Sequence, residues 1–282
     1  MVYTIIEISP RLARQQEGVL HTHVQLGRAR VVNKSIFEYD AVEKENCFFI
    51  ALEVLDNLTH DVVRYSTSTL QPYQALVSID EGGDMHELWE PVQDERIKRY
   101  LALVQSTTQQ SSSGSRPVTA PAYLPWLPQG VRSVLANHLP FYPNLTKPHY
   151  IPTGSLRLLD VLAEKFPHHQ AIMSDFNKLP NALEGVNAPV VQTRLEGTMI
   201  PVTKYTVQQG FFDIFFPTDF KQLQQAHRQI ASSRHSPSES SPAVILDHSE
   251  FLERYADTAQ TQCKDGSNPM LTWYANASWF LS

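Results

Sequence analysis

The run at residues 47–55, CFFIALEVL, constrains the fold more strongly than any other segment, because Glu53 is its only residue that is not apolar. A strand that is buried on both faces has this composition, as in a parallel sheet that helices cover. A shorter strand is predicted before it, at Ala29–Val32. Strands and helices that alternate in this way indicate an α/β fold of the doubly wound type. The hydrophobic fraction of 42% is large enough for a proper core.

The chain opens with MVYTIIEISPRLARQQ, which predicts a strand followed directly by a helix. Residues 2–8 are rich in Val, Tyr, Thr and Ile, which favour strands, and the run is too short for a helix. Ser9 can accept a hydrogen bond from an exposed backbone N–H, and Pro10 suits the first helical position. We therefore expect a helix over residues 11–20 that ends near Gly18.

The middle of the chain predicts an inserted β-hairpin over residues 62–92. Residues 62–65 and 73–80 alternate between apolar and polar side chains, and the sequence DEGGD at 80–84 is a turn signal. Trp89 lies in the strand that returns from this turn. The hairpin is antiparallel and does not belong to the parallel sheet.

The remaining elements follow from shorter patterns. In chain order we expect helices at 96–104 and 156–166, a strand at 169–173 that ends on the acid Asp175, and strand-like runs at 186–194, 198–207 and 210–216. The low-complexity segments 105–121 and 231–242 are expected to be disordered inserts, and the Pro-rich segment 121–152 to be irregular. The aromatic-rich segment 270–281 is expected to pack on the body of the protein.

Composition excludes several classes of function. The net charge of −6 provides no basic field for nucleic acid or an anionic membrane surface. No apolar run approaches the roughly 20 residues that a membrane span needs. Cys47 and Cys263 cannot form a disulfide framework and fit a reducing compartment. His21 and His23 could lie on one face of a strand, but no third ligand is near in the sequence, so no metal site is expected.

Acidic residues end two of the predicted strands, where ligands bind in doubly wound folds. Glu7 could accept hydrogen bonds from both hydroxyls of a nucleoside ribose; the alternative is a solvated acid at a strand end. Glu53 and Asp56 lie close together at the end of the most apolar strand. They could bind a guanidinium by bidentate hydrogen bonds and accept its proton. Alternatively, one caps the next turn and the other faces water.

Two motifs carry a family resemblance. The first, E-x-S-P-x-L, is kept at Glu7, Ser9, Pro10 and Leu12. The second is close to A-N-E-F-F-D-A-L-P and is kept at Ala51, Glu53, Asp56 and Leu58. Residues 154–175 and 210–220 continue the same order of segments. In these motifs the chain resembles the MidA family, which includes a mitochondrial complex I assembly-factor methyltransferase, and within it a divergent fungal-like branch.

The resemblance implies a Rossmann-like core that uses S-adenosylmethionine to methylate an arginine of a protein substrate, in the family a subunit of respiratory complex I. It implies that Glu7 holds the cofactor ribose and that Asp40 contacts the adenine side. It also implies that Glu53 and Asp56 lie where the substrate guanidinium meets the methyl group. A mitochondrial location rests on the resemblance alone, because no targeting segment precedes Met1.

The chain also departs from the family pattern. The glycine-rich loop E-x-G-P-G-x-G of the family does not occur in this sequence. We therefore expect residues 1–282 to form a single incomplete domain that lacks the first strand. The sheet would have an open edge where that strand belongs, and the chain would bind the cofactor weakly or not at all. One hypothesis is a protein arginine methyltransferase that is incomplete in this chain. The other is a non-catalytic relative that binds a respiratory-complex subunit. Leu52 favours the second, because it replaces a motif asparagine whose amide could orient substrate or cofactor.

Overall fold

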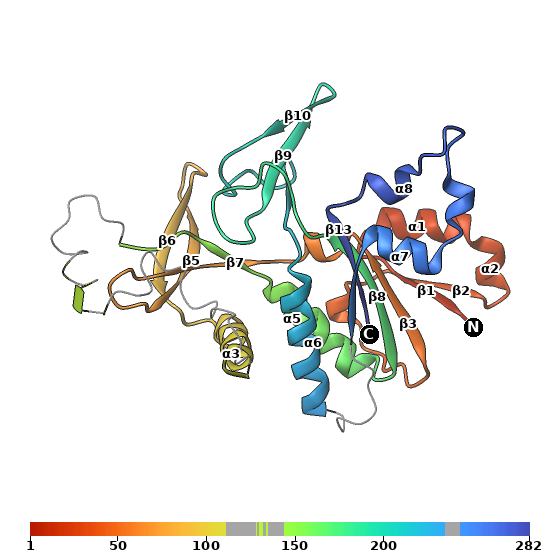
Figure 1. Ribbon diagram of the computed structural model, residues 1–282, viewed down its shortest axis with the longest axis horizontal. Helices are drawn as coiled ribbons and strands as arrows, with labels where there is room; N and C mark the ends of the chain where they lie inside the picture. Colours follow the sequence, from red (N-terminus) through yellow and green to blue (C-terminus); the bar gives the residue numbers. More distant parts are fainter. Residues whose placement is uncertain (111–127, 129, 132–133, 135–143, 235–242) are drawn as a thin grey trace. The chain divides into compact units, whose positions relative to one another are not determined.

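A computed structural model describes residues 1–110, 128, 130–131, 134, 144–234 and 243–282 (Figure 1). The described chain divides into two compact units, and each is described by itself. The first comprises Met1–Cys47 and Arg157–His169, and the second comprises Phe48–Leu156 and Gln170–Ser282. The expectation of one incomplete domain over residues 1–282 stays a prediction.

The first unit contains a parallel pair of strands joined by helices (Figure 1). Its elements are β1 (Tyr3–Ile6), α1 (Pro10–Val19), α2 (His21–Gln25), β2 (Ala29–Val32) and the 3-10 helix η1 (Ile36–Glu38). The Ser9 hydroxyl accepts a hydrogen bond from Leu12 N at 3.4 Å, so the predicted cap is present. His21 and His23, whose spacing could have placed them on one face of a strand, instead lie in the short helix α2 after α1.

A four-stranded sheet forms the core of the second unit, in the order β12-β13-β8-β3. The strands are β3 (Cys47–Leu52), β8 (His169–Phe176), β12 (Val244–Asp247) and β13 (Ala277–Leu281). Backbone hydrogen bonds from Cys47 N to His168 O and from Glu53 N to Ser174 O advance in the same direction, so β3 and β8 are parallel. The helices α6 (Phe220–Arg234) and α7 (His248–Tyr255) pack on β12 and β13.

One face of β3 is exposed, which differs from the strand with two buried faces that its composition predicts. Phe48, Ile50 and Leu52 are 65%, 56% and 53% exposed, whereas Ala51 between them is 3% exposed. The strand is the last in its sheet. An apolar run shows that a strand suits burial, but it does not show whether a layer that would cover each face is present.

Two smaller antiparallel sheets complete the second unit. One has the order β6-β5-β4-β7, with β4 (Asp61–Tyr65), β5 (Pro72–Ile79), β6 (Met85–Pro91) and β7 (His149–Ile151). The hairpin expected over residues 62–92 is present as β5 and β6, but β4 and β7 extend it to four strands. The other sheet has the order β10-β9-β11, with β9 (Val190–Leu195), β10 (Thr198–Pro201) and β11 (Asp213–Phe215).

Helices continue into both segments that were expected to be disordered. Residues 105–110 belong to α3 (Glu95–Gln110), and residues 231–234 belong to α6. Polar residues can extend an existing helix because elongation costs much less free energy than nucleation. The rest of the two segments, 111–121 and 235–242, lies outside the described residues, as does most of 121–152.

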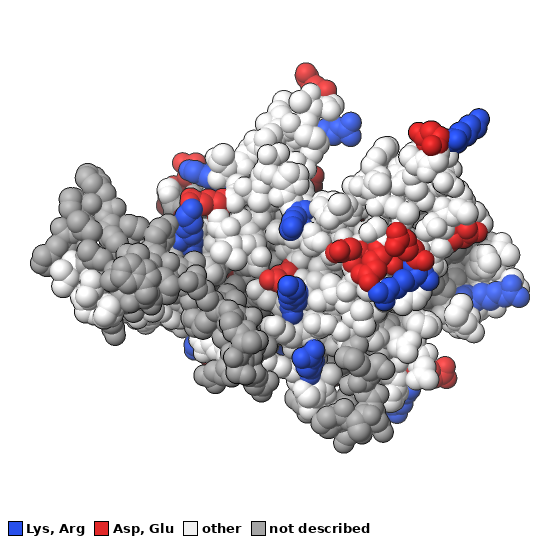
Figure 2. Space-filling model, viewed as in Figure 1, with Lys and Arg blue, Asp and Glu red and all other residues white. Residues whose placement is uncertain are grey.

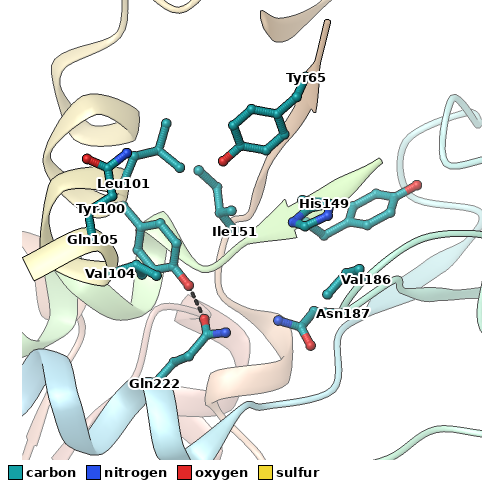
Figure 3. Close-up of a pocket in the computed structure, with 11 residues that line it drawn as sticks. Tyr65, Tyr100, Leu101, Val104, Gln105, His149, Ile151, Val186, Asn187 and Gln222 are labelled. Atoms are coloured by element: carbon teal, nitrogen blue, oxygen red, sulfur yellow. Dashed lines mark hydrogen bonds between the residues drawn. The ribbon is translucent and has the colours of Figure 1, made fainter. Parts of the chain in front are cut away.

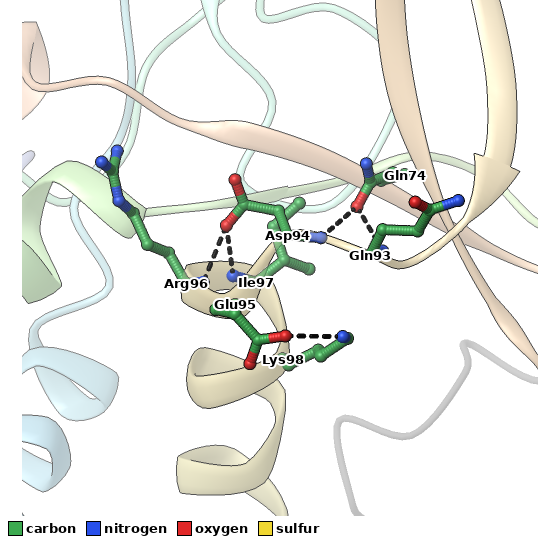
Figure 4. Close-up of polar contacts among 7 residues, drawn as sticks. All are labelled: Gln74, Gln93, Asp94, Glu95, Arg96, Ile97 and Lys98. Atoms are coloured by element: carbon green, nitrogen blue, oxygen red, sulfur yellow. Dashed lines mark hydrogen bonds and ion pairs between the residues drawn. The ribbon is translucent and has the colours of Figure 1, made fainter.

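The start of α3 is fixed to β5 by hydrogen bonds to the side chain of Gln74 (Figure 4). The side-chain oxygen of Gln74 accepts hydrogen bonds from Gln93 N at 2.8 Å and Asp94 N at 3.0 Å. Asp94 Oδ1 then accepts from Arg96 N at 2.7 Å and Ile97 N at 3.3 Å, which satisfies N–H groups of the first helical turn. The helix therefore begins at a defined place on the sheet, and farther along it packs against α6.

The C-terminal segment only partly packs on the body. In β13, Phe280 is fully buried, but Trp273 is 76% exposed after the short helix α8 (Pro269–Thr272). The remaining helices are α5 (Thr153–Lys165) and the 3-10 helices η2 (Leu55–Asn57) and η3 (Thr258–Thr261). Among the helices of the described residues, none is long and apolar enough to cross a membrane. On the face drawn in Figure 2, Lys and Arg side chains lie scattered among Asp and Glu.

We predict that Gly154→Ala destabilises the protein by about 1–3 kcal/mol, because close packing leaves no room for a methyl group. A Cβ at this position would lie 2.7 Å from Thr59 N and 2.8 Å from Thr59 O, and Gly154 N donates to that oxygen. Urea unfolding measures the change. The matched control is Gly18→Ala in α1, where nothing lies within 4 Å and a stabilisation of about 0.5–1 kcal/mol is expected. Equal effects of the two substitutions would contradict the packing argument.

Candidate functional site

The carboxyl ends of β3 and β8 bring three acidic residues together. Because the two strands are parallel, their ends meet at the same edge of the sheet. Glu53 N donates to Ser174 O at 2.9 Å, and Asp56 N donates to Asp175 Oδ2 at 3.0 Å. Glu53, Asp56 and Asp175 therefore form one cluster, which we call the strand-end acids.

Glu53 holds the chain in a rare conformation at the tip of β3. Its φ angle is 52°, in the left-handed region that costs a residue with a side chain about 1–3 kcal/mol. The strained residue turns the chain out of β3 and into η2, where Leu55 is 1% exposed and anchors the turn. The side chain of Glu53 itself is exposed. The strain therefore places an exposed carboxylate beside the buried Asp56.

Asp56 is buried, and its carboxylate interacts with the residues next to it in the turn. Asp56 Oδ1 accepts a hydrogen bond from Asn57 Nδ2 at 2.6 Å. Burial raises the pKa of Asp56, and the nearby charge of Glu53 raises it further, although the hydrogen bond from Asn57 opposes both. A cation at this place would relieve the repulsion between the two carboxylates.

Asp175 is the most buried of the strand-end acids. It is 1% exposed, and its two oxygens accept hydrogen bonds from Asp56 N and, at 2.8 Å, from Phe176 N. Burial raises the pKa of Asp175 to about 6, with a contribution from the charge of Asp56. Asp175 ends a strand that the sequence predicts, but no role in the site was predicted for it. The signal was present, because strand ends carry the ligand sites of such folds.

The segment that follows β11 is hydrogen-bonded to the strand-end acids and to β8. Phe216, directly after β11, donates its N–H to Asp56 O at 3.0 Å, and Thr218 N donates to Phe176 O at 2.8 Å. The Phe216 ring stacks on His60 with a centroid distance of 3.8 Å. Burial lowers the pKa of His60 to about 4, so the ring is neutral at physiological pH. The strand-end acids thus lie where β3, β8 and β11 end or begin.

Glu7 ends β1 in the first unit, at the position that the sequence analysis predicts. Its N–H continues the β1–β2 ladder to Val32 O at 3.0 Å. Glu7 Oε1 accepts from Ser9 N at 2.8 Å, and Oε2 accepts from Gln16 Nε2 at 3.2 Å. Gln16 Oε1 is buried and has no hydrogen-bond partner among the described residues. The carboxylate is partly exposed, so it can accept further hydrogen bonds, and the unsatisfied Gln16 oxygen beside it suits a hydroxyl donor.

Asp40, the other predicted cofactor residue, also lies in the first unit. Its side chain is exposed and forms an ion pair with Lys34 at 3.0 Å. The hydrogen bond from Lys34 lowers the pKa of Asp40. Glu7 and Asp40 thus belong to one unit and the strand-end acids to the other. In the described part of the chain, no group of three or more His, Cys, Asp or Glu could hold a metal ion.

Acids at the carboxyl ends of parallel strands lie where ligands bind in α/β folds. Comparison with known proteins shows which family of α/β proteins this chain belongs to. Residues 1–237 match the family described as "Putative S-adenosyl-L-methionine-dependent methyltransferase". The chain belongs to this family, whose cofactor is S-adenosyl-L-methionine. The family resemblance read from the two motifs is therefore confirmed.

One curated relative is the "Protein arginine methyltransferase NDUFAF7 homolog, mitochondrial" of Schizosaccharomyces pombe. It is 27% identical to this chain over 148 residues. The matched part is 51% of this chain and 29% of the relative, so the chain spans less than a third of that protein in the alignment.

Two solved structures from Burkholderia thailandensis share the fold. One is a COG1565 superfamily member bound to S-adenosyl-homocysteine, with a TM-score of 0.52 and 11% identity. The other is the native structure of a COG1565 superfamily protein, with a TM-score of 0.53 and 10% identity. The superpositions cover 99% of this chain and 63% and 65% of those chains. The likeness confirms the α/β methyltransferase fold.

We predict that Asp175 titrates near pH 6 in the folded protein, and a pH titration followed by carboxyl ¹³C NMR measures this midpoint. The folded protein keeps this proton up to about pH 6, whereas the unfolded chain releases it near its ordinary pKa of 3.8. The unfolded state then binds fewer protons, so the contribution of Asp175 to the free energy of unfolding falls as the pH rises from 4 to 6.

Two variants test this assignment. Asp56→Asn should lower the midpoint of the Asp175 titration, because it removes a neighbouring negative charge. In Asp175→Asn, the free energy of unfolding measured with urea should not show the contribution that makes the wild-type value fall between pH 4 and pH 6. A wild-type midpoint near 4, or stability curves that stay parallel across this range, would contradict the buried pair.

Proposed function

We propose that the protein transfers a methyl group from S-adenosylmethionine to an arginine of a protein substrate, with Glu53 and Asp56 binding the guanidinium. The observation that supports this is the pair of neighbouring carboxylates at the tip of β3: the exposed Glu53 side chain and the buried Asp56. Two adjacent carboxylates match the planar donor fork of a guanidinium. The printed name of the S. pombe relative, a protein arginine methyltransferase, supports the same substrate class.

The strand-end acids suit this chemistry in a second way. When bound, the cofactor supplies an activated methyl group on a sulfonium. A guanidinium nitrogen is a poor nucleophile while its proton is held, because its pKa is above about 12. Glu53 and Asp56 orient the nitrogen and can accept its proton, and the raised pKa of Asp56 makes it a better acceptor. Asp175 keeps the Asp56 backbone in place without touching the substrate.

On the cofactor side we propose roles for two residues of the first unit. Glu7 accepts hydrogen bonds from the ribose hydroxyls, next to the unsatisfied oxygen of Gln16. Asp40 contacts the adenine side, where it would exchange its ion pair with Lys34 for a ligand hydrogen bond. By resemblance to the family, we further propose that the substrate is a subunit of respiratory complex I and that the protein is mitochondrial. The printed name of the relative, which includes the word mitochondrial, supports the location.

A second candidate function is a non-catalytic family member that binds an assembling respiratory-complex subunit. The exposed apolar side chains Phe48, Ile50 and Leu52 on β3 favour it, because such a row is normally covered. Cofactor binding separates the two candidates. The methyltransferase requires it, whereas the binding protein does not.

We predict that Asp56→Asn lowers the rate of methyl transfer by about 100-fold or more, because a positioned proton acceptor contributes that much. The affinity for S-adenosylmethionine should stay within about twofold of the wild-type value, because Asp56 contacts the substrate and not the cofactor. The assay follows tritiated methyl groups from the cofactor into arginine of isolated mitochondrial proteins, with the longest expressible form of the protein.

The matched control for this prediction is Asp84→Asn. This variant makes the same change at an exposed turn of the β5–β6 hairpin and should retain activity. Full activity in Asp56→Asn would remove Asp56 from the site. An equal loss in Asp84→Asn would show that the effect is not specific to the strand-end acids.

We predict that Glu7→Gln weakens binding of S-adenosylmethionine about tenfold to a hundredfold, as expected for hydrogen bonds to a charged acceptor. Isothermal titration calorimetry measures the affinity. Glu17→Gln is the control, because Glu17 is an exposed acid on α1 in the same unit. Unchanged affinity in Glu7→Gln would overturn the ribose assignment, and the absence of any binding heat in the wild type would favour the non-catalytic candidate.

A further inference from the structure

Asn57 directly follows Asp56 and makes two side-chain contacts across the tip of β3. Its Nδ2 donates to Asp56 Oδ1 at 2.6 Å and to Glu53 O at 3.4 Å. An amide NH₂ group has two hydrogens, so one side chain can serve both acceptors. Asn57 therefore joins the carbonyl of one strand-end acid to the carboxylate of another. The motif that this chain resembles has alanine at this position, so the amide is an addition of this chain.

Asn57 is itself held in place, although its side chain is exposed. Its backbone N–H donates to Val54 O at 3.3 Å, which closes the 3-10 helix η2. Its amide meets the carbonyl of Glu53, the residue whose φ angle of 52° turns the chain out of β3. The backbone and the side chain of Asn57 are thus both tied to the same turn. A group that is tied in this way can orient its neighbour.

The hydrogen bond to Asp56 fixes the orientation of its carboxylate. A distance of 2.6 Å is short for a nitrogen donor and an oxygen acceptor, as expected where the acceptor is ionised. A carboxylate whose Oδ1 is held by a donor cannot rotate freely, so the direction of Oδ2 is fixed as well. This direction matters because a guanidinium is planar and binds carboxylates through parallel hydrogen bonds.

The same hydrogen bond keeps Asp56 ionised at a place that favours its protonated form. Burial raises the pKa of Asp56, the hydrogen bond from Asn57 lowers it, and the charge of Glu53 raises it again. Asn57 is thus the neighbouring side chain that stabilises the carboxylate, whereas Glu53 destabilises it.

The other titratable groups around Asp56 cannot take over this role. Asp175 of β8 has a pKa that burial raises to about 6, and its charge repels that of Asp56. His60, in the segment before β4, is neutral at physiological pH because burial lowers its pKa to about 4. Asp213 begins β11, which packs on η2, and its side chain is exposed. None of these three groups carries a positive charge at physiological pH.

We propose that Asn57 is the positioning residue of Asp56: its amide holds the Asp56 carboxylate in the orientation that accepts the substrate guanidinium. Asn57 acts through Asp56 and does not touch the reacting atoms. That the ligand is a guanidinium rests on the proposed function, but the contacts between Asn57 and the strand-end acids do not. A merely structural role would affect stability alone. A positioning role also changes how Asp56 ionises and how fast the bound substrate reacts.

The first measurement needs neither cofactor nor substrate. A pH titration followed by carboxyl ¹³C NMR gives the midpoint of Asp56 in the wild type and in Asn57→Ala. We expect a higher midpoint in the variant, because it loses the hydrogen bond that favours the ionised form. The matched control is Asn144→Ala, which makes the same change at an exposed amide and should leave the midpoint unchanged. An unchanged midpoint in Asn57→Ala overturns the proposal.

The second measurement is the methyl-transfer assay over a range of pH. Asn57→Ala should lower kcat about tenfold or more, because a misplaced acceptor slows the reaction of the bound substrate, while KM stays within about threefold. The acid limb of its kcat profile should lie at higher pH than in the wild type, because Asp56 must lose its proton to act as the acceptor. Asn144→Ala should keep the wild-type kcat and profile.

The two measurements separate this proposal from the proposed function. If the wild type transfers no methyl group, the proposed function fails, and the NMR titration decides on the link between Asn57 and Asp56. If the wild type is active and Asn57→Ala keeps its kcat and its pH profile, the proposed function stands and the positioning role is overturned. A lower kcat in Asn57→Ala with the acid limb in its wild-type place also contradicts the role assigned to this amide.

Discussion

The hydrogen bond from Asp56 N to the buried carboxylate of Asp175 is the constraint on which the site depends. A buried carboxylate is costly unless donors surround it, and Asp175 receives two backbone N–H groups. One of them belongs to the turn after β3, so the position of that turn is set by β8. The carbonyl of the same residue, Asp56, accepts from Phe216 and thereby places the strand β11. A single buried acid therefore orders three chain segments that are far apart in sequence.

Local chemistry made β1, α1 and β2 predictable, because strand-forming residues, the Ser9 cap and Pro10 all act within a few positions of one another. The role of Asp175 was not predictable in the same way, since its partner Asp56 lies 119 residues earlier. The strand that carries it was also predicted too short. Polar residues such as Ser174 and Asp175 argue against a strand locally, but pairing with Trp279 and Ser278 of β13 keeps them in the sheet.

Apolar composition was a good guide to the existence of β3 and a poor guide to its surroundings. The alternation of exposed Ile50 and Leu52 with buried Ala51 shows that only one face of the strand is covered within the described chain. The contact between Tyr65 and His149 illustrates the opposite limit of sequence reasoning (Figure 3). Tyr65 and His149 carry no motif and lie far apart in sequence, yet the pairing of β4 with β7 brings their rings to 5.9 Å. Sheet topology, not local pattern, creates that pair.

The strand-end acids make one electrostatic demand on a ligand. At Glu53 and Asp56 two carboxylates repel each other, and only a cation reduces the cost of their proximity. The backbone of Asp56 is held by Asp175 through its N–H and by Phe216 through its carbonyl, so the turn is placed by hydrogen bonds that do not use the carboxylates of Glu53 and Asp56. The backbone therefore sets the position of the two acids, and their charge selects the ligand.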